Sequence, residues 1–477
     1  MHRLLGKASV LPALLLAVLL GARAQAGQPT WIEMRNENFH AYSSAGKGET
    51  QAFLGHLERV RSFFVQVTGA APADPVPVTV VIFGSSKEYQ TYRPNDFAAA
   101  YYSNHTDRDF IVVGELGEQS SSTAAHEYTH LVFKHGGYQL PPWLNEGLAE
   151  LFSTIRSSGS DIDFGDVIMG RLQPLYHEPW VPMETILTAD RNSPYYNESQ
   201  RASSLYNQSW ALVHMLATTK PYSDNFWPLV QAIGRGTPSV QALETAYGQP
   251  FAQIEHALRS YISGDQFYKL HVKLKTSDTG KLAWTPANPF DVQEIQAELL
   301  AGLPGRQAEA RTRLEQLAKD NPTRPEPLAR LGYLSWYERR SGEAAEYFAR
   351  AFALGNRSPR LLQDYASLRM HDKPEDAVAA LNALISLDAE NVEARIMLGF
   401  LQMSQRQYAQ VLETIRPVKH VSSFESRDNV LLLQALAFMN MQKYTEARGR
   451  AEELKRLSTS PDMQQQADSI LNVVSKH

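Results

Sequence analysis

The chain has 477 residues, of which 43% are hydrophobic and 20% are charged, and its formal net charge is −5. This length favours two or three compact units, and the composition is typical of a globular protein rather than a disordered or membrane-embedded one. The net charge and the lack of a long basic run exclude a general attraction to nucleic acid. Because there is no cysteine, any metal must be held by histidine and carboxylate side chains.

The first 26 residues differ in composition from the rest. Arg3 and Lys7 give a basic start, Val10 to Leu20 form an apolar run, and Ala24-Gln25-Ala26 fits the small-residue pattern of a cleavage site. A transmembrane anchor is the alternative, but such a helix needs about 20 apolar residues. We therefore expect residues 1–26 to be a cleaved signal peptide. The mature protein would be exported, periplasmic or secreted, without stable membrane insertion.

Strands and helices are mixed in the region that follows. The apolar patterns predict a strand over Trp31–Tyr42, a helix over 50–67 and strands over 76–83 and 110–113. The hydroxyl cluster Ser120–Thr123 predicts the cap of a helix over Ala124–Lys134. Pro141-Pro142 predicts the start of a second helix, which runs to Phe152, because proline is tolerated in a first turn where its missing N–H is not needed.

The next region is predicted to be helical over residues 200–265, and Leu205–Ala217 is its clearest helix. The alternation over Tyr268–Leu274 predicts a short strand, and the Gly and Pro residues over 276–289 are typical of a linker. We therefore predict one domain over residues 27–268, a linker over 269–290 and a second domain over 291–477.

Beyond this linker the sequence repeats. Small or apolar residues recur at spacings of 34, 33, 34 and 36 residues, at Ala310, Ala344, Ala377, Val411 and Ala447. A second series of small residues marks the first helix of each pair, at Gly332, Ala366, Gly399 and Ala435. Small residues are needed because the two helices of one hairpin must approach closely. The period resembles the tetratricopeptide repeat, which implies an all-α, protein-binding domain, with Ser460–Val474 as its capping helix. An irregular helical bundle is the alternative.

Within the predicted helix over Ala124–Lys134 lies the segment His126-Glu127-Tyr128-Thr129-His130. Residues four apart share a helix face, so both imidazoles can reach one ion, with Glu127 beside it. Zinc accepts nitrogen and carboxylate ligands, and a catalytic zinc keeps one position open for water. Glu127 can take the proton of that water and later return it, which is general base catalysis. Two histidines on a plain polar helix face are the alternative.

A third ligand is available in the segment WLNEGLAE, over residues 143–150. The turn residues after His130 let a second helix bring the carboxylate of Glu146 back to the two histidines. Glu150 lies one turn further on the same face, where it can accept a hydrogen bond from a ligating histidine and so fix its orientation. A surface acidic helix is the alternative, and the pairing of the two segments makes it weak.

The two segments together resemble the gluzincin metallopeptidases, and WLNEGLAE is similar to their peptidase-MA-like branch. The resemblance implies an α+β fold over residues 31–265, with an upper lobe built on a mixed sheet, a mainly helical lower lobe and a zinc ion between them. It implies that His126, His130 and Glu146 are ligands and that Glu127 is the general base, with Glu150 and Asn145 supporting the histidines. It also implies that an edge strand, here Asp109–Val113, binds extended peptide through its backbone.

The resemblance further implies a side chain that donates to the oxyanion, and Tyr206, at the expected start of a helix, is the candidate. A packing role for this tyrosine is the alternative. His214 is interpreted as a packed or capping histidine. The GxMEN motif of the gluzincin aminopeptidases is absent, since Gly114–Glu118 does not match it. We therefore expect an endopeptidase.

Three functions remain open. The first is an exported zinc endopeptidase whose repeats recruit a protein partner. The second is a protein-binding scaffold whose metallopeptidase-like domain is inactive. Because Glu127 is present, the sequence favours the first: a structural zinc needs no general base and prefers a fourth protein ligand. The third, a glycan hydrolase, lacks a carboxylate pair beyond those assigned to the metal.

Overall fold

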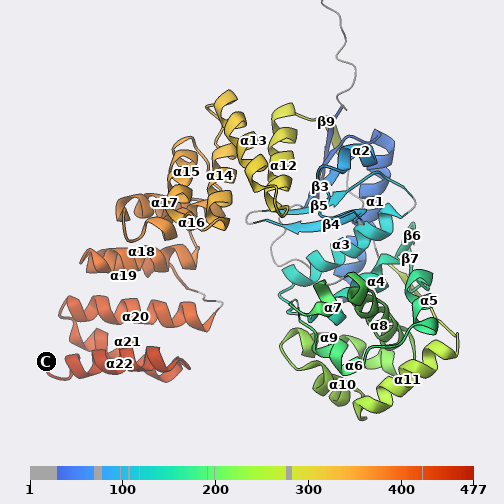
Figure 1. Cartoon of the computed structure of the whole chain (residues 1–477). Coiled ribbons are helices and arrows are strands. Elements are labelled where there is room, and N and C mark those ends of the chain that lie inside the picture. Colours follow the sequence, from blue (N-terminus) through green and yellow to red (C-terminus); the bar gives the residue numbers. More distant parts are fainter. Residues whose placement is uncertain are drawn as a thin grey trace, which may run out of the picture. The chain divides into compact units, whose positions relative to one another are not determined.

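The computed structural model describes residues 30–68, 78–96, 98–105, 108–117, 119–190, 192–197, 199–275, 282–419, 421 and 423–477, without the side chains of 196–202. The predicted signal peptide over 1–26 lies outside these ranges. The chain forms two units, drawn in Figure 1. Unit 1 comprises Met1–Thr91, Ala99–Tyr101 and Ile111–Asn288, and unit 2 comprises Tyr92–Ala98, Tyr102–Phe110 and Pro289–His477. Among the described helices, none is both long and apolar enough to cross a membrane.

A six-stranded sheet has the strand order β4-β5-β3-β2-β1-β9. Its strands are β1 (Ile32–Arg35), β2 (Phe39–Ser43), β3 (Val78–Ile82), β4 (Ala100–Asn104), β5 (Asp109–Val113) and β9 (Ala283–Pro286). β2 runs parallel to β3, whereas β1 is antiparallel to both β2 and β9. This is the mixed sheet that the sequence led us to expect.

Two sequence predictions about this sheet are wrong. The single strand predicted over Trp31–Tyr42 is a hairpin, because Asn36 turns the chain: its Oδ1 accepts hydrogen bonds from the backbone N–H groups of Asn38 and Phe39. β5 (Asp109–Val113) was expected at the sheet edge, but it lies between β4 and β3. Its edges are therefore already paired, and it cannot add a substrate strand. β4 was not recognised because its tyrosines and polar residues leave it only partly buried.

Helices α1 (Lys47–Phe63) and α3 (Ser120–His135) contact each other, and in unit 1 the sheet strands lie on the upper side of α3 in Figure 1. The side chains of β3 and β5 are buried along both strands. Phe64 joins the layers, with ring contacts to Tyr128, Phe133 and Phe152 at centroid distances of 6.2, 6.2 and 5.0 Å. This aromatic core fixes one face of α3.

Below α3 in Figure 1 unit 1 is mainly helical. α4 (Pro142–Ser153) contacts both α3 and α8 (Ser199–Thr218). Besides α1, α3, α4 and α8, the described helical elements of unit 1 as a whole are η1 (Phe64–Thr68), α2 (Ser86–Tyr89), α5 (Met169–His177), α6 (Met183–Thr188), α7 (Pro194–Asn197), η2 (Tyr222–Asn225), α9 (Phe226–Gly234), α10 (Ser239–Tyr247) and α11 (Phe251–Ser263). The helical content predicted over residues 200–265 is confirmed.

A second sheet in unit 1 has the order β6-β7-β8, with β6 (Arg156–Ser158), β7 (Asp161–Phe164) and β8 (Leu270–Lys273). β8 falls in the strand predicted over Tyr268–Leu274, and its Val272 lies opposite Ile162. Both β8 and β9 lie within the segment 269–290 that the sequence led us to expect as a linker. Their backbones pair with β7 and β1, so the described part of this segment contributes to both sheets of unit 1.

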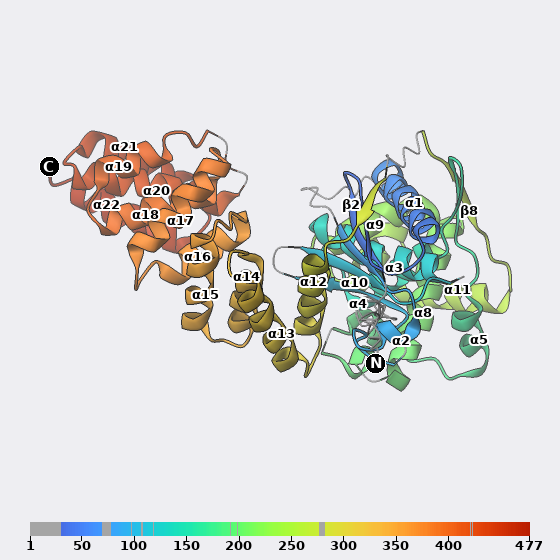
Figure 2. The same ribbon diagram turned by 90° about the horizontal axis from the view of Figure 1, so that it is seen from above.

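Unit 2 is built mainly from antiparallel helix pairs that follow one another in chain order, as Figure 2 shows from a second direction. The helices are α12 (Pro289–Gly302), α13 (Gln307–Asp320), α14 (Glu326–Tyr337), α15 (Ser341–Ala353), α16 (Pro359–Arg369), α17 (Pro374–Leu387), α18 (Val392–Ser404), α19 (Tyr408–Ile415), α20 (Phe424–Asn440), α21 (Tyr444–Leu457) and α22 (Pro461–Val474). Each helix contacts the next one, so the hairpins form a stack.

The repeat predicted from the small residues is confirmed. Ala310, Ala344, Ala377, Val411 and Ala447 are all 0% exposed. Gly332 shows why the crossings need small side chains, since a Cβ there would lie 2.4 Å from Cε1 of Phe348. The terminal helix α22 buries Ala467, Ile470 and Val474 on one side only, as expected of a capping helix.

Candidate metal centre

The first two candidate ligands lie on α3. This helix buries Ala124, Ala125, Tyr128, Leu131 and Val132. Tyr128 is 2% exposed and packs against Phe39 at a ring-centroid distance of 5.7 Å. His126 and His130 are four positions apart and therefore share another face, where both are only partly buried. The helix begins at Ser120, so the predicted cap Ser120–Thr123 forms its first turn instead.

The third candidate ligand lies on α4, which is buried on nearly every side. Trp143 is 0% exposed, and its Nε1 donates to Oγ of Ser239 at 2.9 Å. Gly147 allows α4 to approach α8 closely: a Cβ there would lie 2.5 Å from Cγ2 of Val213 and 2.8 Å from the backbone oxygen of Ser209. The tight packing of α4 thus fixes the position of Glu146, which is 3% exposed.

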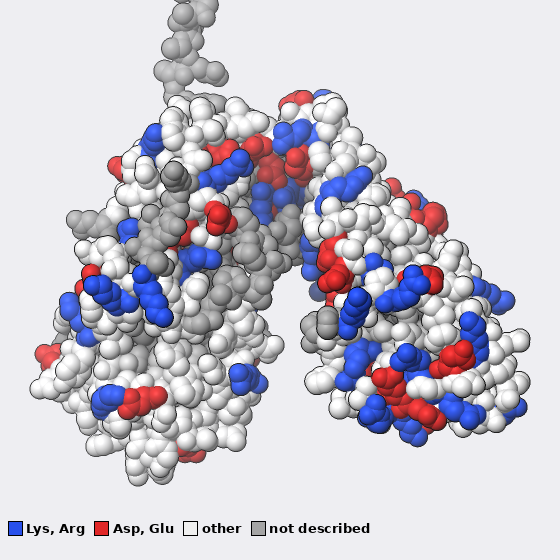
Figure 3. Space-filling view, turned by 180° about the vertical axis from the view of Figure 1, so that it is seen from behind, with Lys and Arg blue, Asp and Glu red and all other residues white. Residues whose placement is uncertain are grey.

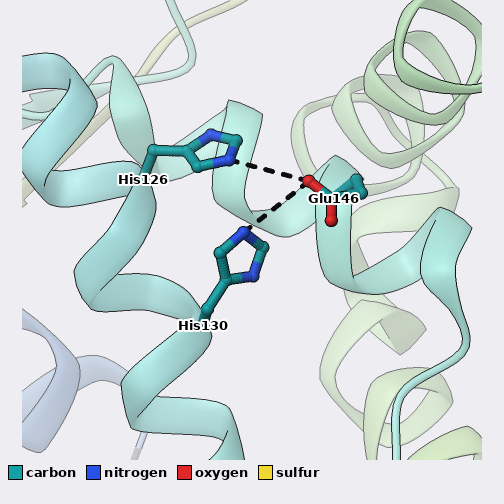
Figure 4. A group of neighbouring side chains, drawn as sticks. All are labelled: His126, His130 and Glu146. Carbon is teal, nitrogen blue, oxygen red and sulfur yellow. Dashed lines mark ion pairs between the residues drawn. The ribbon is translucent and has the colours of Figure 1, made fainter. Parts of the chain in front are cut away.

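The three side chains converge on one point. One oxygen of Glu146 lies 3.6 Å from Nε2 of His126 and 3.6 Å from Nε2 of His130. One ligand atom from each residue lies within 4.8 Å of the other two. Figure 4 shows both imidazoles, presented by one helix, directed toward the carboxylate on the neighbouring helix. The structure thus brings together the three side chains that the sequence singled out as candidate ligands.

The spacing of these donors fits a divalent metal ion. Ligand atoms about 2.1 Å from a tetrahedral ion lie roughly 3.4 Å from one another. The two distances of 3.6 Å are close to this value. Two imidazole nitrogens and one carboxylate oxygen are ligand types that zinc accepts, and they leave a fourth tetrahedral position open.

The charges around His126 favour a cation in this place. Burial by itself lowers the pKa of His126, but a hydrogen bond with Glu146 and the negative charges of Glu127 and Glu150 outweigh it and raise the pKa to about 9. The same negative charges that stabilise a proton on His126 would also stabilise a metal cation at this site. Glu127, the predicted general base, is thus close enough for its charge to act on His126, the first candidate ligand.

Glu150 was predicted to hold a ligating histidine, and the structure gives it a different main partner. Arg171 of α5 donates to Oε1 of Glu150 from Nε at 3.1 Å and from Nη2 at 2.5 Å. The same guanidinium lies 5.0 Å from the ring centroid of Tyr206. Tyr206 is not at a helix start, since α8 begins at Ser199. Arg171 is thus a residue near the site that the sequence reasoning missed, because it belongs to no recognisable motif.

The support expected for the histidines is incomplete. Nδ1 of His130 is buried and has no hydrogen-bond partner within the described part of the chain. Asn145, the other predicted supporter, is partly buried, and its backbone N–H bonds to the carbonyl oxygen of Pro141. His214 lies apart from the ligands: it is 0% exposed, with Nδ1 2.7 Å from the Tyr261 hydroxyl and Nε2 2.8 Å from the Gly165 carbonyl oxygen. This environment is that of the packed histidine we expected.

The sequence matches no described protein family and no curated protein. Among solved structures, parts of the chain are similar to three tetratricopeptide repeat (TPR) proteins. YrrB, a TPR protein with an unusual peptide-binding site, is 13% identical over 37% of this chain and 90% of its own, with a TM-score of 0.32. A thermophilic TPR protein from Thermus thermophilus is 16% identical over 38% of this chain and 98% of its own, with a TM-score of 0.25.

The third is a TPR protein from Parabacteroides merdae, which is 14% identical over 64% of this chain and 99% of its own, with a TM-score of 0.26. These three TM-scores are low, so our account of the repeats rests on the helix packing of unit 2 itself.

Proposed function

We propose that the chain is a zinc-dependent peptidase, with His126, His130 and Glu146 as metal ligands. The observation that carries the proposal is the convergence of one ligand atom from each residue within 4.8 Å, on two helices held by buried packing. The choice of a peptide as substrate is supported by the resemblance of the segments HEYTH and WLNEGLAE to the gluzincin metallopeptidases.

A bound zinc ion would supply an acidified water and would polarise the carbonyl of the scissile bond. Glu127, next to His126 in α3, is proposed to accept the proton of that water and to pass it to the leaving amine. The hydroxyl of Tyr206 is the proposed donor to the developing oxyanion, and Arg171 lies against the ring of this tyrosine. Because Arg171 also holds Glu150, one guanidinium connects the metal-ligand helix α4 with α8.

The test compares the full chain with Glu127→Gln on a library of N-acetylated peptides, alongside zinc analysis of both proteins. We expect wild type to cleave and Glu127→Gln to keep its zinc but lose at least about 10²-fold in turnover. Glu184→Gln, on an exposed turn of α6, makes the same chemical change away from the site and should cleave normally. Acetylated ends block aminopeptidases, so cleavage supports the endopeptidase proposal.

A second candidate is a protein-binding scaffold, favoured by one observation: at least five stacked helix pairs make up most of unit 2. On the face drawn in Figure 3 basic and acidic side chains are interspersed over this unit. Within unit 2 some charged side chains pair between neighbouring helices, as Arg311 does with Glu338 and Arg369 with Glu346. Zinc binding without turnover on any library peptide would favour the scaffold over the peptidase. In either case we propose that the repeats bind a protein partner.

We also propose that the protein is exported to the periplasm or secreted, on the composition of residues 1–26. Sequencing of the N-terminus of the mature protein tests this directly. A mature chain that begins close to Gly27 supports export, and a chain that retains Met1 in the soluble cytoplasmic fraction contradicts it.

A further inference from the structure

Unit 1 contains a polar pocket whose described lining includes none of the three candidate metal ligands, His126, His130 and Glu146. It has a volume of about 550 Å³ and lies where α1, the first turn of α3 and β6 meet. Its walls include Arg59 of α1, Arg156 and Ser157 of β6, and Ser120 and Ser121 of α3. The pocket is thus lined by two guanidinium groups and three hydroxyl groups.

Neither arginine is neutralised by a carboxylate within the described part of the chain. Nε of Arg59 donates to Oγ of Ser157 at 2.6 Å. Nη1 of Arg156 donates to Oγ of Ser122 and to the carbonyl oxygen of Ile155, each at 3.1 Å. These neutral partners orient the guanidinium groups and leave their charges in place. Glu49 is the one carboxylate among the lining residues that the structure describes, and there the arginines outnumber it.

A buried histidine lines the same pocket. His56 is 9% exposed, and its Nε2 has no hydrogen-bond partner within the described ranges. A buried polar atom without a partner costs about 1–3 kcal/mol and calls for an explanation. Burial lowers the pKa of His56 to about 4, and the positive charges of Arg59 and Arg156 act in the same direction.

The start of α3 adds to the positive potential. The first turn of this helix contains no acidic residue, and the side chain of its N-cap residue, Gln119, makes no capping hydrogen bond. The N-terminus of a helix carries a partial positive charge from its backbone N–H groups. It therefore acts in the same direction as Arg59 and Arg156.

We propose that this pocket binds a small organic anion through an oxyanion group, either a phosphate or a carboxylate. Arginine is suited to both groups because its planar fork of N–H donors matches their oxygens. The volume is within the range of about 300–1,000 Å³ found for small-molecule sites and is more than one inorganic ion needs. The proposal does not depend on peptidase activity.

Isothermal titration calorimetry of the full chain at low ionic strength tests this site, with inorganic phosphate and acetate as separate probes. We expect saturable binding of at least one probe. Arg59→Gln and Arg156→Gln should each weaken it about tenfold or more, because each removes a charge-assisted hydrogen bond. Arg61→Gln, on the same helix α1 but outside the pocket lining, makes the same charge change and should bind like wild type.

Tighter binding of phosphate than of acetate would identify the group as a phosphate, and the reverse order as a carboxylate. Because Arg156 is exposed, its variant should fold, and circular dichroism verifies this. Two results would overturn the proposal: no saturable binding of either probe, or an equal loss of affinity in Arg61→Gln and Arg156→Gln. The readout is binding, so a failure of the peptidase proposal leaves this test intact.

Discussion

Replacement of Gly147 by alanine should disturb the proposed metal centre without removing any of its proposed ligands. Gly147 follows Glu146 in α4, on the side where this helix meets α8. A Cβ at this position would lie 2.5 Å from Cγ2 of Val213 and 2.8 Å from the backbone oxygen of Ser209, whereas ordinary contacts begin near 3.4 Å. The backbone oxygen cannot rotate away, so the two helices must separate.

The size of the effect follows from this overlap. Insertion of one methyl group into a well-packed interior costs about 1–3 kcal/mol. For a domain of this size, each kcal/mol lowers the melting temperature by roughly 2–4 °C, so we expect a decrease of about 2–12 °C. Because Glu146 is the adjacent residue, we also expect zinc affinity to fall by about tenfold, as it does when groups that orient a ligand are lost.

Thermal denaturation and competition with a chromophoric chelator measure the two effects. Gly48→Ala is the matched control, since a Cβ there has no atom within 4 Å and alanine favours the helix α1. The control should melt at the wild-type temperature or slightly above it, with unchanged zinc affinity. If Gly147→Ala behaves like this control, the close packing of α4 on α8 does not position the ligand, and our reasoning is refuted.

Three further predictions concern charge and metal. Burial alone would raise the pKa of Glu298, but the positive charges of Arg108 and Arg330 lower it well below its usual range. The ionised Glu298 therefore stabilises the fold at neutral pH, and this stabilisation is lost as the pH falls below about 4. Glu298→Gln should thus lower the free energy of unfolding at pH 7 by about 3–5 kcal/mol, as measured by urea denaturation, and should make it less dependent on pH in the acid range. A variant as stable as wild type at pH 7 would contradict this prediction. Arg171→Met leaves the carboxylate of Glu150 buried without this partner and should cost about 1–3 kcal/mol, most of which the double variant with Glu150→Gln should recover. Removal of zinc with EDTA should lower the melting temperature, because an ion at 100 times its Kd stabilises the native state by about 2.7 kcal/mol; an unchanged temperature would speak against a metal in the native protein.

The sequence was sufficient where a pattern repeats or where residues at a fixed spacing must share a face. Residues four apart lie on the same face of any α-helix, so the common direction of His126 and His130 could be predicted without knowledge of the tertiary structure. The recurrence from Ala310 to Ala447 likewise carries its own period and predicted the hairpins of unit 2.

The features that the sequence did not predict depend on contacts between segments, which no local sequence pattern encodes. Arg171 reaches Glu150 from another helix, 21 residues along the chain, and nothing in its neighbours indicates that pairing. The hairpin β1–β2 depends on hydrogen bonds of one asparagine, Asn36, inside a run that otherwise resembles a single strand. β5 was assigned to the sheet edge on the family resemblance alone, and β4, which pairs with it, was missed because its partly exposed tyrosines show no clear apolar alternation.

Zinc stoichiometry tests the central claim most directly, since the peptidase proposal for α3 and α4 depends on a bound ion. The full chain, stripped with chelator and dialysed against zinc, should retain about one ion per chain by elemental analysis. His130→Ala and Glu146→Ala should each retain far less, whereas Glu127→Gln should retain as much as wild type. A wild-type chain that holds no zinc, or that loses none when His130 and Glu146 are replaced, would contradict our assignment of this site.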